Sequence, residues 1–288
     1  MSDIELAVIG GSGLYDMEAL QDVEEISVST PFGAPSDAII TGTLHGRRLA
    51  FLPRHGRGHI LTPSEVPYRA NIFALKMLGA KYIIAVSACG SLRLDYAPSH
   101  IVIPDQLFDN TKGIRASTFF GDGLAAHISV ADPFSPELSA ALADAVKAAD
   151  GRMHKGGAFI TVEGPRFSTR GESRTYRNWS MDIIGMTTSP EAFLAAEAEI
   201  AYAVMAHITD YDVWHESEEP VTVDMVMETL KKNAQLAQET ISHLVQNMKH
   251  WAGDFPAHHA LQYALITDRD AIPPETKKKL APIVGNYL

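Results

Sequence analysis

Cysteine is almost absent from this sequence, as are long apolar runs and any excess of positive charge. Its 288 residues include one cysteine, Cys89, so no disulfide can form within the chain, as is typical of a reducing cytoplasm. No apolar run approaches the ~18 residues of a membrane span, and the first residues lack the features of a signal peptide. The formal net charge is −11, which argues against nucleic-acid binding. We expect a soluble, cytoplasmic protein with no membrane or nucleic-acid partner, which holds any anion in a local site.

Short apolar runs alternate with helical patterns along the chain. Apolar residues make up 46% of it and charged residues 20%, a composition typical of a globular protein with a sizeable core. Most runs are continuous, as in strands covered on both faces. The expected strands are Ile4–Ile9, Ala38–Thr43, Arg48–Pro53, Tyr82–Val86, Ile101–Ile103, Ala158–Val162, Asp182–Met186 and Ala201–Ile208. There is no internal repeat or Gly/Ser linker, so we predict an α/β fold. It forms a single domain over residues 1–288, with a mixed central sheet flanked by helices and weak signals after about residue 250.

Local signals mark the starts of several helices. Ser135-Pro136-Glu137 and Ser189-Pro190-Glu191 each combine an N-cap serine, a proline at the first helical position and an acid in the first turn. Another helix begins between residues 62 and 68 and ends near residue 79. The longest helix starts at Thr222, and apolar residues recur on one of its faces as far as Met248.

The first expected strand ends in a glycine-rich turn, Gly10-Gly11-Ser12-Gly13. Such a turn lets N–H groups and the Ser12 hydroxyl approach an anion. A plain glycine turn is the alternative interpretation. A dinucleotide-binding fingerprint fails, because Asp16 stands where its third glycine or alanine belongs.

Polar residues also follow other strands. Arg54 and His55 follow one of them, and arginine is suited to a bidentate contact with phosphate, to which a histidine can add a donor. Ser87 and Ala88 end another strand beside Cys89, which we interpret as a packing residue because nothing nearby in sequence lowers its pKa. Each motif alone could be a solvated loop. Together they indicate one site, since open α/β sheets bind ligands at the carboxyl ends of their strands.

Two carboxylates end a further strand. Asp210 and Asp212 are two residues apart, so their side chains can share one side of the chain and meet one ligand. The segments 163–168 and 186–188 also follow strands and belong to the same group of loops.

Several motifs in order carry a resemblance to a known family. They are GGSGLYD, TPFGAPSD, LPRHGRGH, SACGSLR, TVEGPRFSTR, MTTSPE and TDYDVW, over roughly residues 4 to 250. Through them the sequence resembles the 5′-methylthioadenosine phosphorylases of the purine nucleoside phosphorylase superfamily. Ser12 and Ser87 stand where many relatives have threonine, Met227 replaces a leucine, and Pro67 interrupts a stretch that usually reads Val-Asn-Tyr.

The resemblance implies a role for each candidate residue. Phosphate would be held by Ser12, Arg54, His55, Ser87, Ala88 and Thr187. The nucleoside would contact Phe167, Ser168 and Met186, with Asp210 and Asp212 at N7 and the 6-amino group of the purine. His59, Val223, Val226 and Met227 would line the 5′ end, and His127 would reach the site of a neighbouring subunit in a homotrimer.

The implied reaction is phosphorolysis of S-methyl-5′-thioadenosine to adenine and 5-methylthioribose 1-phosphate. Inorganic phosphate is the co-substrate, and neither a cofactor nor a metal is needed. Asp210 would protonate N7, which requires a raised pKa. The alternatives are a purine nucleoside phosphorylase acting on adenosine or inosine, a nucleosidase that uses water, and a noncatalytic purine-binding protein on the same fold.

Overall fold

The fold is organised around strand β5, Tyr82–Ser91, which pairs with three other strands. The computed structural model describes residues 4–215, 223–251 and 253–288, without the side chains of Ser12, residues 223–232 and His250. Strand β5 runs parallel to β1 (Leu6–Gly10) on one side and to β11 (Ala201–Asp210) on the other. Every residue of β1 and β11 is buried, as expected for strands covered on both faces.

The remaining strands extend this sheet in both directions. The order is β2-β3-β4-β1-β5-β10-β9-β7, with β11, β6 and β8 on the second side of β5. Their bounds are Gln21–Ile26 (β2), Ile39–Leu44 (β3), Arg47–Pro53 (β4), Ile101–Ile103 (β6), Gln106–Asn110 (β7), Met153–Lys155 (β8), Ala158–Val162 (β9) and Ile183–Gly185 (β10). Strands β1, β4, β5 and β11 are parallel, whereas β10 is antiparallel to β5. The sheet is mixed, as predicted.

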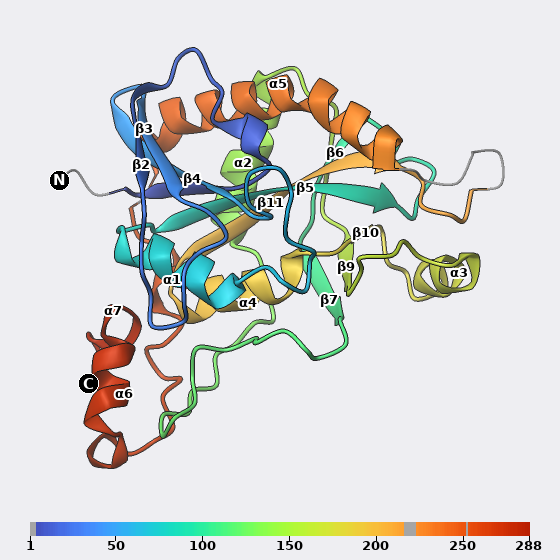
Figure 1. Cartoon of the computed structure of the whole chain (residues 1–288). Helices are drawn as coiled ribbons and strands as arrows, with labels where there is room; N and C mark the ends of the chain where they lie inside the picture. The colour runs from blue at the N-terminus through green and yellow to red at the C-terminus, as the bar shows by residue number, and fades with distance from the viewer. Residues whose placement is uncertain (1–3, 216–222, 252) are drawn as a thin grey trace.

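Helices cover both faces of the sheet (Figure 1). On one face lie α2 (Pro136–Ala148) and α5 (Val223–Asn247), and on the other lie α1 (Tyr68–Met77) and α4 (Thr188–Glu197). Leu142 and Ile241 are buried in the first layer, and Phe73 and Leu194 in the second. Helix α3 (Arg170–Asn178) connects β9 to β10. None of the described helices is long and apolar enough to cross a membrane.

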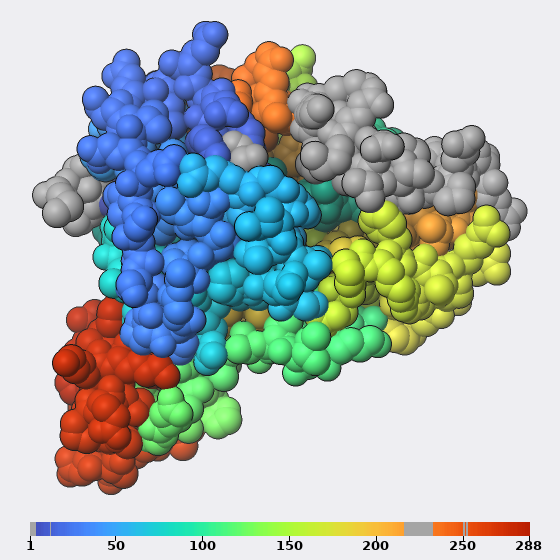
Figure 2. All heavy atoms as spheres, viewed as in Figure 1, coloured from blue at the N-terminus to red at the C-terminus, as the bar shows by residue number. Residues whose placement is uncertain are grey.

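The segment after α5 is helical and packed, although its sequence pattern is weak. It contains the 3₁₀ turns Pro256–His259 and Arg269–Ala271 and the short helices α6 (Pro274–Lys279) and α7 (Ala281–Val284). Figure 2 shows the C-terminal residues protruding from the body beside the segment near residue 120. A bridge between Ala126 and Leu265 joins the two segments, and Ile283 of α7 is buried in the same core as α1.

Every strand expected from the sequence is present, but β2, β7 and β8 were not expected. Strand β2 is exposed and rich in acids, and β7 is mostly polar; both lie at ends of the sheet path. Strand β8 has three residues and pairs only with β6. A continuous apolar run identifies central strands, so it misses strands that are polar or very short.

At the start of α4, the expected capping by the Ser189 side chain is not made. The backbone of Ser189 is extended, and the regular part of α4 follows from Pro190. The Ser189 hydroxyl, however, donates to Asp109 Oδ2 at 2.6 Å instead of capping the first turn. The Ser189 hydroxyl thus links α4 to β7.

The start of α2 provides a stability test. Ser135 Oγ accepts a hydrogen bond from the Leu138 N–H, whereas the buried Oγ of Ser139, one turn later, has no partner among the described residues. We expect Ser135→Ala to lower the free energy of unfolding by about 1 kcal/mol. Ser139→Ala removes an unsatisfied hydroxyl and is expected to cost nothing. Urea unfolding of both variants checks the difference, and equal losses would contradict the cap.

Candidate active site

Strand β5 changes partners along its length, and this opens a gap in the sheet. β1 pairs with β5 only as far as Ala85, and β10 pairs with it only from Gly90. Between these points β11 is the one described strand that is bonded to β5. Gly185, at the end of β10, lies against Cys89. The carboxyl ends of β1, β4 and β10 therefore converge on residues 86–89, the kind of place where open α/β sheets bind ligands.

Arg54 spans this gap from the end of β4. Its side chain is 3% exposed, and its Nη1 and Nη2 atoms donate to the carbonyls of Val86 (3.0 Å) and Ile9 (3.4 Å). The bidentate face of the guanidinium is occupied by Glu191 of α4, with both N···O distances at 2.8 Å. Burial alone would lower the pKa of Arg54, but the Glu191 carboxylate raises it above its ordinary value, so the guanidinium stays charged.

This pairing changes the contact that Arg54 can make with phosphate. Four of its five N–H groups have acceptors in the protein, which leaves one on Nη1. A bidentate contact with phosphate, as expected from the residue type, is not open to this arrangement. The role of Arg54 in holding phosphate stays a prediction, through a single N–H and its charge.

His55 is placed beside Arg54 but does not add a donor. Its Nδ1 lies 2.8 Å from the Leu61 carbonyl, so Nδ1 carries the proton, and its ring stacks on that of His59 at 4.2 Å. Burial, with a contribution from the Arg54 charge, lowers the pKa of His55 to about 4. The neutral ring therefore presents Nε2 as an acceptor, and the role of His55 in holding phosphate stays a prediction.

The other expected phosphate contacts are hydroxyls and backbone around the same gap. Ser87 Oγ is buried and has no partner among the described residues, which is costly unless a ligand satisfies it. Ala88 follows it on β5. Thr187 is buried at the N-terminus of α4, and its side chain does not cap the helix. Ser12 lies in the 3₁₀ turn Ser12–Leu14 after β1, and its side chain is outside the described residues.

Asp210 and Asp212 lie together at the end of β11. A register shift after Ile208 makes Asp210 rather than Thr209 face Gly90, the usual effect of a β-bulge. Both carboxyls are buried. Gly90 makes room for them, because a Cβ there would lie 3.0 Å from Asp210 Oδ1. The structure thus brings the two aspartates together, as their spacing predicts.

The two carboxyls have different surroundings. Asp210 accepts hydrogen bonds from the Thr209 hydroxyl (2.6 Å) and the Asp212 N–H (2.7 Å). Asp212 Oδ2 has no hydrogen-bond partner among the described residues. Burial raises the pKa of Asp212 to about 6, and the Asp210 charge adds to this. The Ser173 hydroxyl partly offsets the shift without reaching hydrogen-bonding geometry. Asp212 therefore binds a proton unusually readily.

The loops expected to contact the nucleoside adjoin these groups. Gly164 has a φ of +68° and lies against Met186, where a Cβ would be 2.5 Å from its Sδ. Phe167 and Ser168 follow on the same loop, and the Phe167 ring is 39% exposed. The ring of His59 stacks on that of His55.

Four expected residues are not brought into the site by the described structure. His127 is exposed, and its N–H donates to the carbonyl of Ala264, which lies in the C-terminal segment. The side chains of Val223, Val226 and Met227 lie outside the described residues.

Sequence reasoning missed the partners of the expected ligands. Glu191 was read only as a helix-start acid, although it lies in the MTTSPE motif. Arg115 was not considered, yet it is buried and bonded to the Met186 carbonyl. Cys89 is buried, and burial raises the pKa of its thiol, so it is a packing residue as expected. Across the described residues, no cluster of histidine, cysteine and acidic groups could hold a metal ion.

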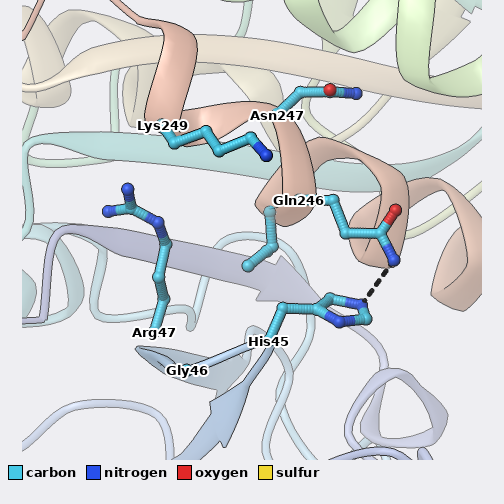
Figure 3. A pocket seen from close by; sticks show the side chains of 7 residues that line it. His45, Gly46, Arg47, Gln246, Asn247 and Lys249 are labelled. Carbon is cyan, nitrogen blue, oxygen red and sulfur yellow. Dashed lines mark hydrogen bonds between the residues drawn. The ribbon is translucent and has the colours of Figure 1, made fainter.

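A second hollow, away from the strand ends of the candidate site, has no aspartate pair and no buried arginine among the described residues that line it (Figure 3). It has a volume of about 660 Å³ and lies where the β3–β4 turn meets the end of α5. His45 is bonded there to Ser242 and Gln246, and Arg47 to Glu5. The hollow is at the start of β4, whereas Arg54 follows the end of that strand, so it is separate from the candidate site.

Comparison with known proteins explains why these groups converge. The profile of the phosphorylase superfamily matches residues 5–246. The chain belongs to the phosphorylase superfamily. It is 54% identical over 287 residues to the S-methyl-5′-thioadenosine phosphorylase of Chloroflexus aurantiacus, covering 100% of this chain and 99% of that one. It is likewise 54% identical to the enzyme of that name from Geobacter sulfurreducens, covering 98% and 99%.

Solved structures agree with this phosphorylase assignment. A methylthioadenosine phosphorylase from an antarctic soil metagenomic library superposes with a TM-score of 0.94 at 50% identity, covering 98% of this chain and 99% of that one. A variant of the adenosine/methylthioadenosine phosphorylase from Schistosoma mansoni, in complex with methylthioadenosine, gives 0.81 at 36% identity, covering 86% and 92%. The expected family and fold are confirmed. That residues 1–288 form one phosphorylase domain stays a prediction, since the profile ends at residue 246.

The raised pKa of Asp212 predicts how the stability of this phosphorylase depends on pH. Its ordinary pKa is 3.8 and its folded value about 6, so the folded chain binds more protons between these values. The free energy of unfolding therefore falls as pH rises from about 4 to about 6. We expect Asp212→Asn to match wild type at pH 4 and to exceed it at pH 7, by up to roughly 3 kcal/mol.

Urea unfolding of both proteins from pH 4 to 7 measures this difference. Asp144→Asn, at an exposed position on α2, is the control and should follow wild type. Parallel stability curves for wild type and Asp212→Asn would contradict the raised pKa.

Proposed function

We propose that this chain catalyses phosphorolysis of S-methyl-5′-thioadenosine, giving adenine and 5-methylthioribose 1-phosphate. The relatives named above carry this activity in their names, and one solved relative is bound to methylthioadenosine. The observation that carries the choice of base is the buried pair Asp210 and Asp212 facing Gly90. Two carboxyls can accept from a 6-amino group and give a proton to N7, whereas a 6-oxopurine favours amide side chains.

Charge explains how such a site would cleave the bond. As the bond between the sugar and the purine breaks, positive charge develops on the ribose and negative charge on the base. Phosphate beside Arg54, Ser87 and Thr187 would stabilise the ribose cation and then bond to it. His55 Nε2, which is an acceptor in the neutral ring, would take a hydrogen bond from the phosphate hydroxyl.

The proton for the purine would come from the aspartate pair. Asp210 would contact N7, and Asp212, whose pKa is raised by burial, would hold a proton before the substrate binds. Because the carboxyls are adjacent, they titrate as a pair. Phe167 and Met186 would contact the base and the ribose, while His59 and the first turn of α5 would surround the 5′ methylthio group.

Several features belong to the same proposal and rest on the family resemblance. Phosphate is the only co-substrate, and neither a metal nor an organic cofactor takes part. The active form is a homotrimer in the cytoplasm, in which His127 reaches a neighbouring site. The exposure of His127 and its place beside the C-terminal segment are compatible with a role between subunits.

A single assay tests the proposed activity. Base release is measured from methylthioadenosine, adenosine and inosine, each with and without phosphate. We expect release to require phosphate, to yield the sugar 1-phosphate, and to favour methylthioadenosine over adenosine by about 10- to 200-fold in kcat/KM because the methyl group is buried. Release of free sugar without phosphate would identify a nucleosidase, and a preference for inosine would overturn the assignment of the aspartates.

The roles of the two aspartates can be separated by substitution. Asp210→Asn removes the group placed at N7, and we expect kcat to fall by about 10²-fold or more. Asp212→Asn should mainly reduce the preference for 6-amino over 6-oxo purines. Steady-state kinetics with methylthioadenosine and inosine, with Asp144→Asn as the control, checks both. If Asp212→Asn loses more kcat than Asp210→Asn, the proton donor is Asp212.

A further inference from the structure

Arg115 is a buried cation whose contacts join two loops of the site. It follows β7, outside any strand or helix, and its side chain is 2% exposed. Its Nη1 donates to the carbonyls of Met186 (2.7 Å) and Ser189 (2.8 Å). Its Nε and Nη2 donate to the carboxylate (2.8 Å) and the carbonyl (2.7 Å) of Glu163. The planar guanidinium of Arg115 thus donates four short hydrogen bonds, two to Glu163 and two to the carbonyls of Met186 and Ser189.

The two directions lead to different parts of the proposed site. Met186 and Ser189 flank Thr187, at the loop assigned to ribose and phosphate. Glu163 opens the loop that carries Phe167 and Ser168, assigned to the base. The guanidinium therefore bridges the loop on the base side and the loop on the phosphate side.

The Glu163 end of the bridge is itself held in place. Its carboxylate also accepts hydrogen bonds from the Ser64 hydroxyl and the Lys112 N–H. Although partial burial opposes it, the bonds that it accepts lower the pKa of Glu163, so the carboxylate stays charged. Arg115 also lies over the Tyr68 ring, whose hydroxyl donates to the Pro63 carbonyl. Neither end of the bridge can shift without breaking charged hydrogen bonds.

We propose that Arg115 is a positioning residue for glycosidic cleavage, because its contacts fix the distance between the loop Glu163–Ser168 and the loop Met186–Ser189. This rests on the proposed function and adds a residue that touches neither base nor phosphate. A lysine cannot replace it, since one ammonium cannot reach two loops with the geometry of a planar fork. A shift of about 1 Å between reacting groups can cost 10²-fold in rate.

The test compares two variants, Arg115→Ala and Arg115→Lys, with the control Arg48→Ala. Arg48→Ala also removes the partner of a carboxylate, that of Glu24, which lies on the edge strand β2. We expect kcat for methylthioadenosine to fall about 100-fold in Arg115→Ala, with smaller changes in the KM for methylthioadenosine and the KM for phosphate. In Arg48→Ala we expect kcat to stay unchanged. Ethylguanidinium, which replaces the missing atoms, should restore part of the kcat of Arg115→Ala only. A loss of global stability alone would not be reversed in this way.

Arg115→Lys covers the case in which the alanine variant does not fold, because it keeps the buried charge. We expect wild-type circular dichroism and at least a 10-fold loss of kcat; wild-type kcat in this variant would overturn the proposal. If wild-type protein does not cleave methylthioadenosine, the proposed function fails separately. Calorimetric titration with adenine then decides: Arg115→Lys should bind it at least 10-fold more weakly, and equal affinity would overturn the positioning role.

Discussion

The site depends on a single constraint, that strand β5 changes its neighbour along one of its two sides. Its first half is bonded to β1 and its last residues to β10, while β11 accompanies it on the other side. The residues between, Val86 to Cys89, are left with a free edge inside the molecule. Buried backbone groups need partners, and Arg54 supplies one by donating to the Val86 carbonyl. The Ser87 hydroxyl, which has no partner among the described residues, lies on the same stretch of β5, where we propose that an anion binds.

The buried pair of Arg54 and Glu191 then sets the charge of this gap. A guanidinium alone would be an attractive phosphate ligand, but burial without a partner would be costly. Glu191 removes that cost and is in turn bonded by the Tyr202 hydroxyl at 2.8 Å. The cation is consequently balanced before any ligand binds. In the proposed site, selectivity for phosphate would therefore come from the direction of N–H and hydroxyl groups as much as from net charge, which suits a chain whose formal charge is −11.

The sequence was informative where chemistry and burial coincide in one short segment. The apolar runs predicted the central strands, and the polar residues after them predicted Arg54, Ser87, Asp210 and their convergence. It was silent where a property depends on a distant partner. Nothing local in Arg54-His55 indicates that Glu191 takes the bidentate face or that Leu61 fixes the proton on His55. The exposed strand β2 was not predicted for the same reason, because it is a strand through its pairing with β3 and not through its composition.

The two halves of the site are thus built by different means. The phosphate side rests on regular structure, because Arg54, Ser87 and Thr187 are fixed by strand ends and by α4. The base side depends partly on loops, and a loop keeps its place only through specific bonds. The pair Asp210 and Asp212 depends less on loops, because Asp210 ends the buried strand β11 and Asp212 follows it directly, both close to Gly90. The loop of Phe167 lies outside the sheet and is held by bonds such as those of Arg166 with Glu172. Its alignment with Met186 is the part that we propose for the hydrogen bonds of Arg115 with Glu163 and the Met186 carbonyl.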